Sequence, residues 1–189
     1  MTRLLLATLL AAGFTAAHAE SATYLIEPTH TFVYFEAAHF KTSTLRGRFE
    51  KKEGTVTIDK AAKTGKADIT IDASVVSTGV PQLDTHLKSK DFFNVAEYPT
   101  VKFTADKFNF DGDKLSDVSG MLTLMGKTQP VTLKATNFNC YMSPMLKREV
   151  CGGDFETTIT RSQYGMNYGL PGIPDNIRLL IQIEAVKQQ

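Results

Sequence analysis

The sequence is poor in the residues that mark several classes of protein. It has no tryptophan, only two cysteines and no excess of either charge, with 21 lysines and arginines against 20 aspartates and glutamates. Nucleic-acid binding needs a clustered excess of basic residues, so this balance argues against DNA or RNA as a partner. With 42% hydrophobic residues, the 189-residue chain is instead suited to one folded domain with a sizeable core.

One long hydrophobic run is present, close to the N-terminus. Arg3 is followed by a mostly apolar segment at 4–14, and residues 17–19 supply a small-x-small cleavage site. A membrane-spanning helix needs about 20 apolar residues, which is more than this run offers. We therefore expect residues 1–19 to be a secretory signal peptide and residues 20–189 to form the exported domain, located in the periplasm.

Export determines how the two cysteines are interpreted. Cys140 and Cys151 both follow the expected cleavage site, and an oxidising compartment favours their pairing. The chain has no C-x-x-C motif and no histidine after Cys151 to complete a zinc site. We expect a structural disulfide, which would stabilise the fold by about 3 kcal/mol.

Alternation of apolar and polar residues dominates the rest of the chain. This pattern is typical of β-strands with one buried face, because neighbouring side chains on a strand point to opposite sides. Between Pro81 and Ser89 the spacing of Leu83 and Leu87 predicts one short helix instead. Alternation therefore predicts an antiparallel all-β protein. The runs lie at 33–37, 45–49, 56–58, 69–73, 101–105, 118–124, 131–135, 155–159 and 177–183.

Periodicity alone leaves two architectures open. The apolar faces mix large residues such as Phe35 and Phe103 with small ones such as Gly47 and Ala105. Such a mixture could fill the core of a sandwich, or it could line a tunnel in a closed barrel of about eight strands.

Several segments, taken in order, resemble one known family. They include the opening Tyr-Leu-Ile-Glu-Pro-Thr-His-Thr at 24–31, Gly-Arg-Phe at 47–49 and Asp-Thr-His-Leu-Lys-Ser-Lys-Asp-Phe-Phe at 84–93. Tyr-Pro-Thr-Val-Lys-Phe at 98–103, the segment 120–131 and Arg-Ser-Gln-Tyr-Gly-Met at 161–166 complete the set. Together they resemble the YceI-like family of exported, lipocalin-like barrels associated with polyisoprenoid binding.

This chain departs from the family pattern at a few positions. Glu27 stands in place of the usual aspartate and Thr31 in place of the usual serine. Lys52 lies where an apolar residue is common, and the insert that carries the two cysteines is not a general feature of the family.

The resemblance implies an eight-stranded antiparallel barrel with a short helix and an elongated apolar interior. It also implies a binding or transport protein, not an enzyme, whose ligand is a long amphiphile such as a polyisoprenoid or an isoprenoid quinone, with no further cofactor. A membrane redox protein is a candidate partner and a homodimer a candidate assembly. Alternation predicts the lipid-binding wall to contain Val33, Phe35, Phe49, Ile69, Ile71, Phe103, Leu122, Leu124, Leu133, Phe155 and Ile159, with Phe92 and Phe93 near the helix.

Two other functions remain as alternatives. The first is a structural or partner-binding barrel with a filled core. The second is a lipid-modifying enzyme that uses His86, although Asp84 and His86 lie two positions apart on the predicted helix and do not face each other. His30, His39 and His86 form no metal-binding motif, so we expect no metal.

Arg161 has two interpretations. It follows a predicted strand and could be buried beside a carboxylate at one end of the barrel, or it could contact a head group. We favour the structural role, because a buried guanidinium must be paired.

Overall fold

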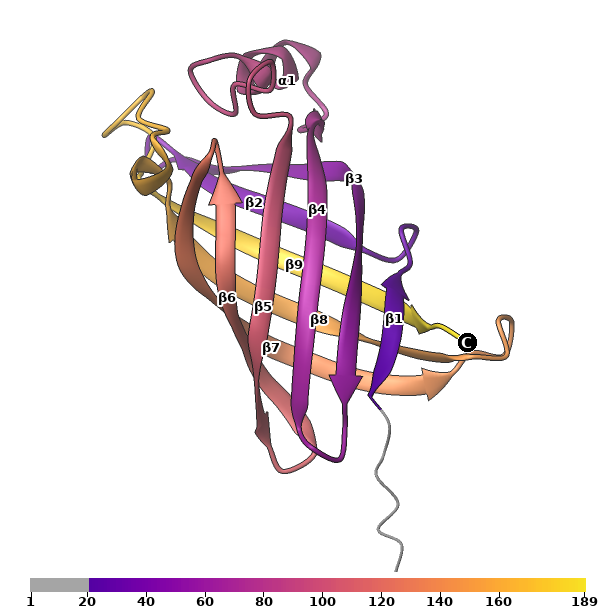
Figure 1. Ribbon diagram of the computed structural model, residues 1–189. Coiled ribbons are helices and arrows are strands. Elements are labelled where there is room, and N and C mark those ends of the chain that lie inside the picture. Colours follow the sequence, from indigo (N-terminus) through magenta and orange to yellow (C-terminus); the bar gives the residue numbers. More distant parts are fainter. Residues whose placement is uncertain (1–20) are drawn as a thin grey trace, which may run out of the picture.

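The computed structural model describes residues 21–189, so the expected signal peptide at 1–19 lies outside the described residues. Strands account for most of this part of the chain, as the alternation predicts (Figure 1). The elements in chain order are β1 (Ala22–Ile26), β2 (Phe32–His39), β3 (Ser43–Asp59), β4 (Thr64–Ser77), α1 (Pro81–Lys88), β5 (Thr100–Asp111), β6 (Lys114–Leu124), β7 (Lys127–Met142), β8 (Glu149–Thr160), the 3-10 helix η1 (Arg161–Tyr164) and β9 (Asn176–Lys187).

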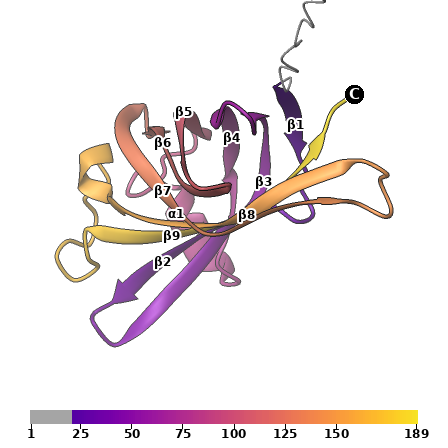
Figure 2. The same cartoon turned by 90° about the horizontal axis from the view of Figure 1, so that it is seen from below.

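The strands form one antiparallel sheet that closes on itself (Figures 1 and 2). Each strand from β3 to β9 pairs with the next, and β2 pairs with both β9 and β3 to complete the circle. β1 also pairs with β3 and β9, but at different positions along them: Leu25 lies opposite Thr55, whereas Val33 of β2 lies opposite Phe49. β1 and β2 therefore lie one after the other in the same place between β3 and β9. The barrel has eight such strand positions around its circumference, so the expected eight-stranded barrel is confirmed.

The strand boundaries correct two details of the sequence interpretation. The predicted runs at 45–49 and 56–58 are parts of the single strand β3, which a β-bulge between Phe49 and Lys51 divides. β1 was not among the predicted runs, because only Tyr24 and Ile26 of its five residues are buried and so short an alternation gives little signal.

The bulge in β3 changes which residues face the interior. Before it, the inward side chains are at odd positions, such as Phe49, and after it they are at even positions, such as Lys52 and Ile58. A β-bulge places an extra residue in one strand and so reverses the alternation beyond it. This single irregularity places a lysine on the inner face of the barrel.

Helix α1 lies over one end of the barrel (Figure 1). It begins with Pro81, whose fixed φ suits the first helical position, and it buries Leu87. The carboxylate of Asp84 accepts hydrogen bonds from the backbone N and Oγ1 of Thr78 at 2.7 and 2.6 Å, which ties the helix to the segment after β4. No helix within residues 21–189 is long and apolar enough to cross a membrane.

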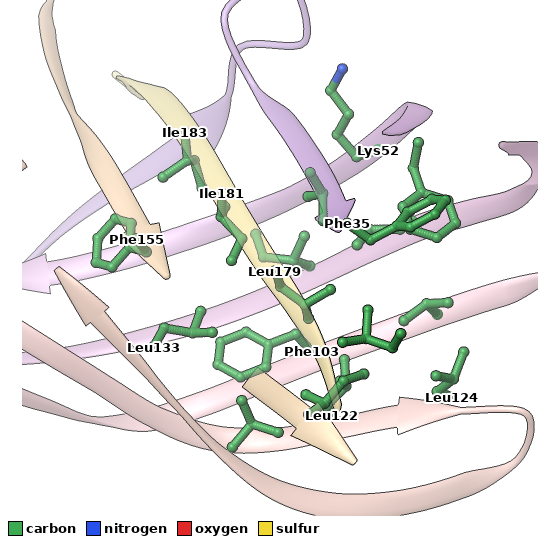
Figure 3. Close-up of a pocket in the computed structure, with 18 of the residues that line it drawn as sticks. Phe35, Lys52, Phe103, Leu122, Leu124, Leu133, Phe155, Leu179, Ile181 and Ile183 are labelled. Atoms are coloured by element: carbon green, nitrogen blue, oxygen red, sulfur yellow. The ribbon is translucent and has the colours of Figure 1, made fainter. Parts of the chain in front are cut away.

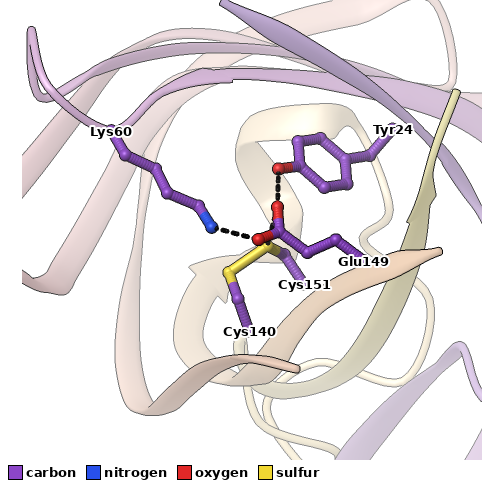
Figure 4. The surroundings of a disulfide bond; sticks show 5 residues. All are labelled: Tyr24, Lys60, Cys140, Glu149 and Cys151. Carbon is purple, nitrogen blue, oxygen red and sulfur yellow. Dashed lines mark hydrogen bonds and ion pairs between the residues drawn. A yellow bond between two sulfur atoms is a disulfide. The ribbon is translucent and has the colours of Figure 1, made fainter. Parts of the chain in front are cut away.

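A disulfide and a half-buried carboxylate hold the opposite end together (Figure 4). Cys140 of β7 and Cys151 of β8 lie opposite each other in the register and are joined by an S–S bond of 2.03 Å, as predicted. Beside them, Glu149 accepts hydrogen bonds from the Tyr24 hydroxyl and, at 2.8 Å, from Lys60 Nζ. Burial raises the pKa of Tyr24, and its bond to Glu149 raises it further. The base of the β7–β8 hairpin, which projects beyond the barrel (Figure 2), is thus fixed to β1 and to the β3–β4 turn.

Candidate functional site

The barrel encloses an apolar cavity with a volume of about 230 Å³ (Figure 3). Its wall extends from Leu87 and Phe93 at the α1 end to Ile58, Phe108 and Leu115 near the opposite turns, so it follows most of the barrel's length. Apart from a few polar side chains, the wall consists of aliphatic and aromatic residues. Such an interior can hold a hydrophobic molecule but offers little directional hydrogen bonding.

The residues predicted to contact lipid all lie on this wall. Alternation identified those on strands correctly as inward-facing, because side chains on a strand keep a strict period of two between bulges, whereas Phe92 and Phe93 lie in the segment between α1 and β5. Their contact with a lipid remains a prediction. They are Val33, Phe35, Phe49, Ile69, Ile71, Phe92, Phe93, Phe103, Leu122, Leu124, Leu133, Phe155 and Ile159.

The sequence interpretation omitted one continuous strip of the wall. Ile177, Leu179, Ile181 and Ile183 of β9 line the cavity and lie opposite residues of β2 and β8 (Figure 3). Their alternation was visible in the sequence. It did not show that the last strand would close against β2, which is a contact between opposite ends of the chain.

Aromatic rings gather at the end of the cavity under α1. The ring centroid of Phe49 lies 5.9 Å from that of Phe35, in a tilted arrangement, and 5.4 Å from that of Phe93, in the edge contact that aromatic pairs favour. Gly47 makes room for this cluster, because a Cβ at that position would lie 2.2 Å from Cζ of Phe35. The rings therefore narrow one end of the interior, while aliphatic side chains line the remainder.

Arg161 lies on the wall at the same end and is fully buried. Its guanidinium donates to the carbonyl oxygens of Pro174, Met166 and Ile173 at 3.0, 2.9 and 3.0 Å. The structural role is the one observed, but the partners differ from those expected: they are backbone carbonyls, while Asp175 binds the backbone N and the hydroxyl of Ser162. Arg161 thus holds the loop between η1 and β9 against the barrel.

Comparison with known proteins places the chain in a family. The model of the YceI-like domain matches residues 24–185. Protein YceI of Escherichia coli O157:H7 is 36% identical over 179 residues, which cover 93% of each chain. The chain belongs to the YceI-like family. Protein YceI of Salmonella newport (strain SL254) is 35% identical over 185 residues, or 96% of each chain.

Solved structures share the YceI-like barrel. A Campylobacter jejuni YCEI protein superposes with a TM-score of 0.70 at 26% identity, over 80% of this chain and 90% of that one. BcnA of Burkholderia cenocepacia has a TM-score of 0.70 at 21% identity, over 85% and 99% of the two chains. A polyisoprenoid binding domain from Saccharophagus degradans has a TM-score of 0.63 at 17% identity, over 88% and 99%.

The histidines of this YceI-like protein occupy separate places. His30 lies in the β1–β2 loop, His39 ends β2 and His86 is on α1. His86 Nε2 lies 3.1 Å from Asp91 Oδ2, and its ring contacts Phe92 and Tyr168. Within residues 21–189 there is no group of three His, Cys, Asp or Glu side chains that could hold a metal ion.

The arrangement around His86 is that of a helix anchor. Ser89 Oγ accepts a hydrogen bond from the backbone N of Asp91, and Asp84 binds Thr78. Asp84 and Ser89 therefore form hydrogen bonds with groups other than His86. Such bonds suit residues that anchor the helix, whereas a Ser-His-Asp triad needs both residues bonded to the histidine.

Glu27 holds the loop that separates β1 from β2 in this YceI-like protein. Its carboxylate accepts hydrogen bonds from the backbone N and Oγ1 of Thr29 and from the backbone N of His30, and it lies 2.6 Å from His30 Nδ1. Partial burial raises the pKa of Glu27, but these hydrogen bonds lower it more, to about 2. The ionised carboxylate is thus the form that orders the loop.

Glu27→Gln is expected to weaken the fold at neutral pH by about 1–2 kcal/mol, because it removes a charged hydrogen-bond acceptor. A carboxylate whose pKa is lower in the folded than in the unfolded state stabilises the fold above its unfolded pKa. That stabilisation is lost as the pH falls from 4.5, its ordinary value, through about 2. Urea unfolding at pH 7 and at pH 3 should show a smaller acid-dependent loss in the variant than in the wild type. The exposed Glu53→Gln serves as the control, and equal pH dependence in wild type and Glu27→Gln would contradict the assignment.

Proposed function

We propose that this protein is an exported carrier or store for a long amphiphilic lipid, of the polyisoprenoid or isoprenoid quinone type, held in the barrel interior. The observation that carries the proposal is the apolar cavity that follows the barrel from α1 to the opposite turns. A filled-core structural barrel, the main alternative, requires an interior closed by the protein's own side chains. The open volume favours the carrier.

The free energy of burial is sufficient for such a ligand. An isoprene unit has five carbons, so its full burial contributes about 4 kcal/mol at about 0.8 kcal/mol per carbon group. Three or four buried units contribute about 12–16 kcal/mol. Association and ordering cost about 4–15 kcal/mol, and a preformed cavity keeps this cost near the lower end, about 4–8 kcal/mol. The remainder, about −8 kcal/mol, corresponds to a micromolar complex.

The family supports binding in place of turnover. The YceI-like barrel is a binding-protein fold, and the polyisoprenoid binding domain of Saccharophagus degradans shares it. In this chain the polar groups around His86 hold the helix, so we propose no catalytic role for them. A membrane redox protein, as a donor or acceptor of the lipid, and a second copy of the chain remain candidate partners.

Mass analysis of the protein as the cell exports it tests the proposal. The protein is purified from the periplasmic fraction without detergent, and organic extracts are analysed for bound lipid. We expect a polyprenyl-type lipid in the extract. We also expect the mass of the intact protein to be that of a chain that begins at Glu20. An extract without lipid would overturn the carrier function, and protein that retains residues 1–19 would overturn export.

A further inference from the structure

Lys52 is a charged residue on an otherwise apolar part of the cavity wall. The bulge in β3 turns it inward, opposite Ile71 of β4, and it is 6% exposed (Figure 3). On its other side β3 pairs with β2 at Phe49 and with β1 at Thr55, so Lys52 lies beside the β1–β2 loop. Lys52 therefore lies at the height along the barrel where β2 takes the place of β1 between β3 and β9.

The Lys52 ammonium is incompletely satisfied. It donates one hydrogen bond, to the carbonyl oxygen of Glu50 at 3.3 Å, and lies 4.4 Å from the ring centroid of Phe32. An ammonium has three donors, so two are left without a protein acceptor within the described residues. Burial lowers the pKa of Lys52, in line with its small exposed fraction.

The charged groups around Lys52 already have other partners. Arg48 and Glu50, on the same strand, pair with each other at 2.8 Å, and Glu27 of the β1–β2 loop binds Thr29 and His30. Within residues 21–189 Lys52 forms no ion pair with these carboxylates, although both act on it through space. A buried cation without a direct ion pair is unfavourable, so an anion that came within hydrogen-bond distance of it would be stabilised.

Apart from His39, which is exposed at the end of β2, the other polar side chains of the wall have hydrogen-bond partners. Arg161 donates to three carbonyls, and the Thr31 hydroxyl donates to the carbonyl of Glu184 and accepts from its backbone N. The Tyr24 hydroxyl donates to Glu149. Of the two basic residues on the described wall, Lys52 and Arg161, Lys52 is the one whose N–H donors remain free for a ligand.

We propose that Lys52 selects amphiphiles whose head group carries an oxyanion, a phosphate or a carboxylate, and holds that head group beside the β1–β2 loop. The apolar chain of the ligand then lies along Phe103, Leu122 and the β9 residues (Figure 3). This inference rests on the proposed lipid-binding function and adds the chemical class of the head group. A lysine suits this role because its ammonium acts as a point charge and can donate hydrogen bonds to either a phosphate or a carboxylate.

Two pairs of lipids that differ only in the head group test the proposal. Geranylgeranyl phosphate is compared with geranylgeraniol, and palmitate with hexadecanol, by titration calorimetry on delipidated protein. The variant is Lys52→Met, which removes the charge and keeps an unbranched side chain. Lys51→Met is the matched control. Lys51 precedes Lys52 on β3, but its side chain is exposed and its Nζ lies 3.7 Å from Asp72 Oδ2. Lys52→Gln provides a second neutral variant should Lys52→Met fold poorly.

We expect the wild type and Lys51→Met to bind an oxyanion lipid at least tenfold more tightly than the matching alcohol, and Lys52→Met to lose this preference. The pair that shows the preference identifies phosphate or carboxylate as the source. Equal binding of both members of each pair to the wild type, or an unchanged preference in Lys52→Met, would overturn the selection by Lys52 alone. If the wild type bound none of the four lipids, the selection by Lys52 would be overturned, while the carrier function would be decided by the lipid in the periplasmic extract.

Discussion

Phe103→Asp is expected to lose bound lipid, with the amount in extracts falling at least tenfold. Phe103 is buried on the cavity wall, opposite Leu122 of the next strand. A carboxylate at this place has no partner, and the unpaired polar group costs several kcal/mol when a hydrocarbon chain excludes water from it. A loss of about 1.4 kcal/mol already lowers affinity tenfold. The measurement is mass analysis of lipid that co-purifies with equal amounts of folded protein.

Two further variants separate charge from shape and from general destabilisation. Met121→Asp places the same charge on the neighbouring strand at an exposed position, and it should keep its lipid. Phe103→Ala leaves the wall apolar and should also keep lipid. Wild-type lipid content in a folded Phe103→Asp protein would show that the ligand does not occupy this cavity.

Arg161→Ala is expected to lower the free energy of unfolding by about 3–5 kcal/mol. The substitution leaves the carbonyls of Pro174, Met166 and Ile173 without their buried charged donor, and a polar group that loses a buried partner is costly. Met166 and Ile173 also line the cavity, so the end under α1 should loosen with the loop. Urea unfolding measures the change.

Arg46→Ala is the control for Arg161→Ala. Arg46 forms an ion pair with Glu36 at 2.7 Å, but its side chain is 66% exposed. Exposed pairs contribute little, so we expect a loss below about 1 kcal/mol. Similar losses in the two variants would mean that the carbonyl contacts of Arg161 do not hold the barrel end.

Sequence and structure agree where the physics is local. Alternation identified inward-facing residues such as Phe103 and Leu133, because successive side chains on a strand cannot share a face. It could not choose between a sandwich and a barrel, since closure depends on β9 meeting β2. The family motifs, not the periodicity, supplied the barrel.

The remaining features depend on contacts between distant residues. Arg161 was expected to meet a carboxylate, but its partners are carbonyls whose positions depend on how the following loop turns. Lys52 could have been found, because the inward positions change from odd at Phe49 to even at Val56 and Ile58. That change of parity is the sign of a bulge, and it indicates which lysine of the strand faces inward.

Because β1 and β2 divide one barrel position, the strands are not joined in the same way all around the wall. Other neighbouring strands are joined by long ladders of backbone hydrogen bonds, such as the uninterrupted ladder between β8 and β9. At residues 27–31 cohesion comes largely from side chains: the carboxylate of Glu27 and the hydroxyl of Thr31, which bridges to the backbone of Glu184. The contacts at this seam are therefore mainly hydrogen bonds of individual side chains, in contrast to the backbone ladders of the long strand pairs, and the seam lies next to the ammonium of Lys52.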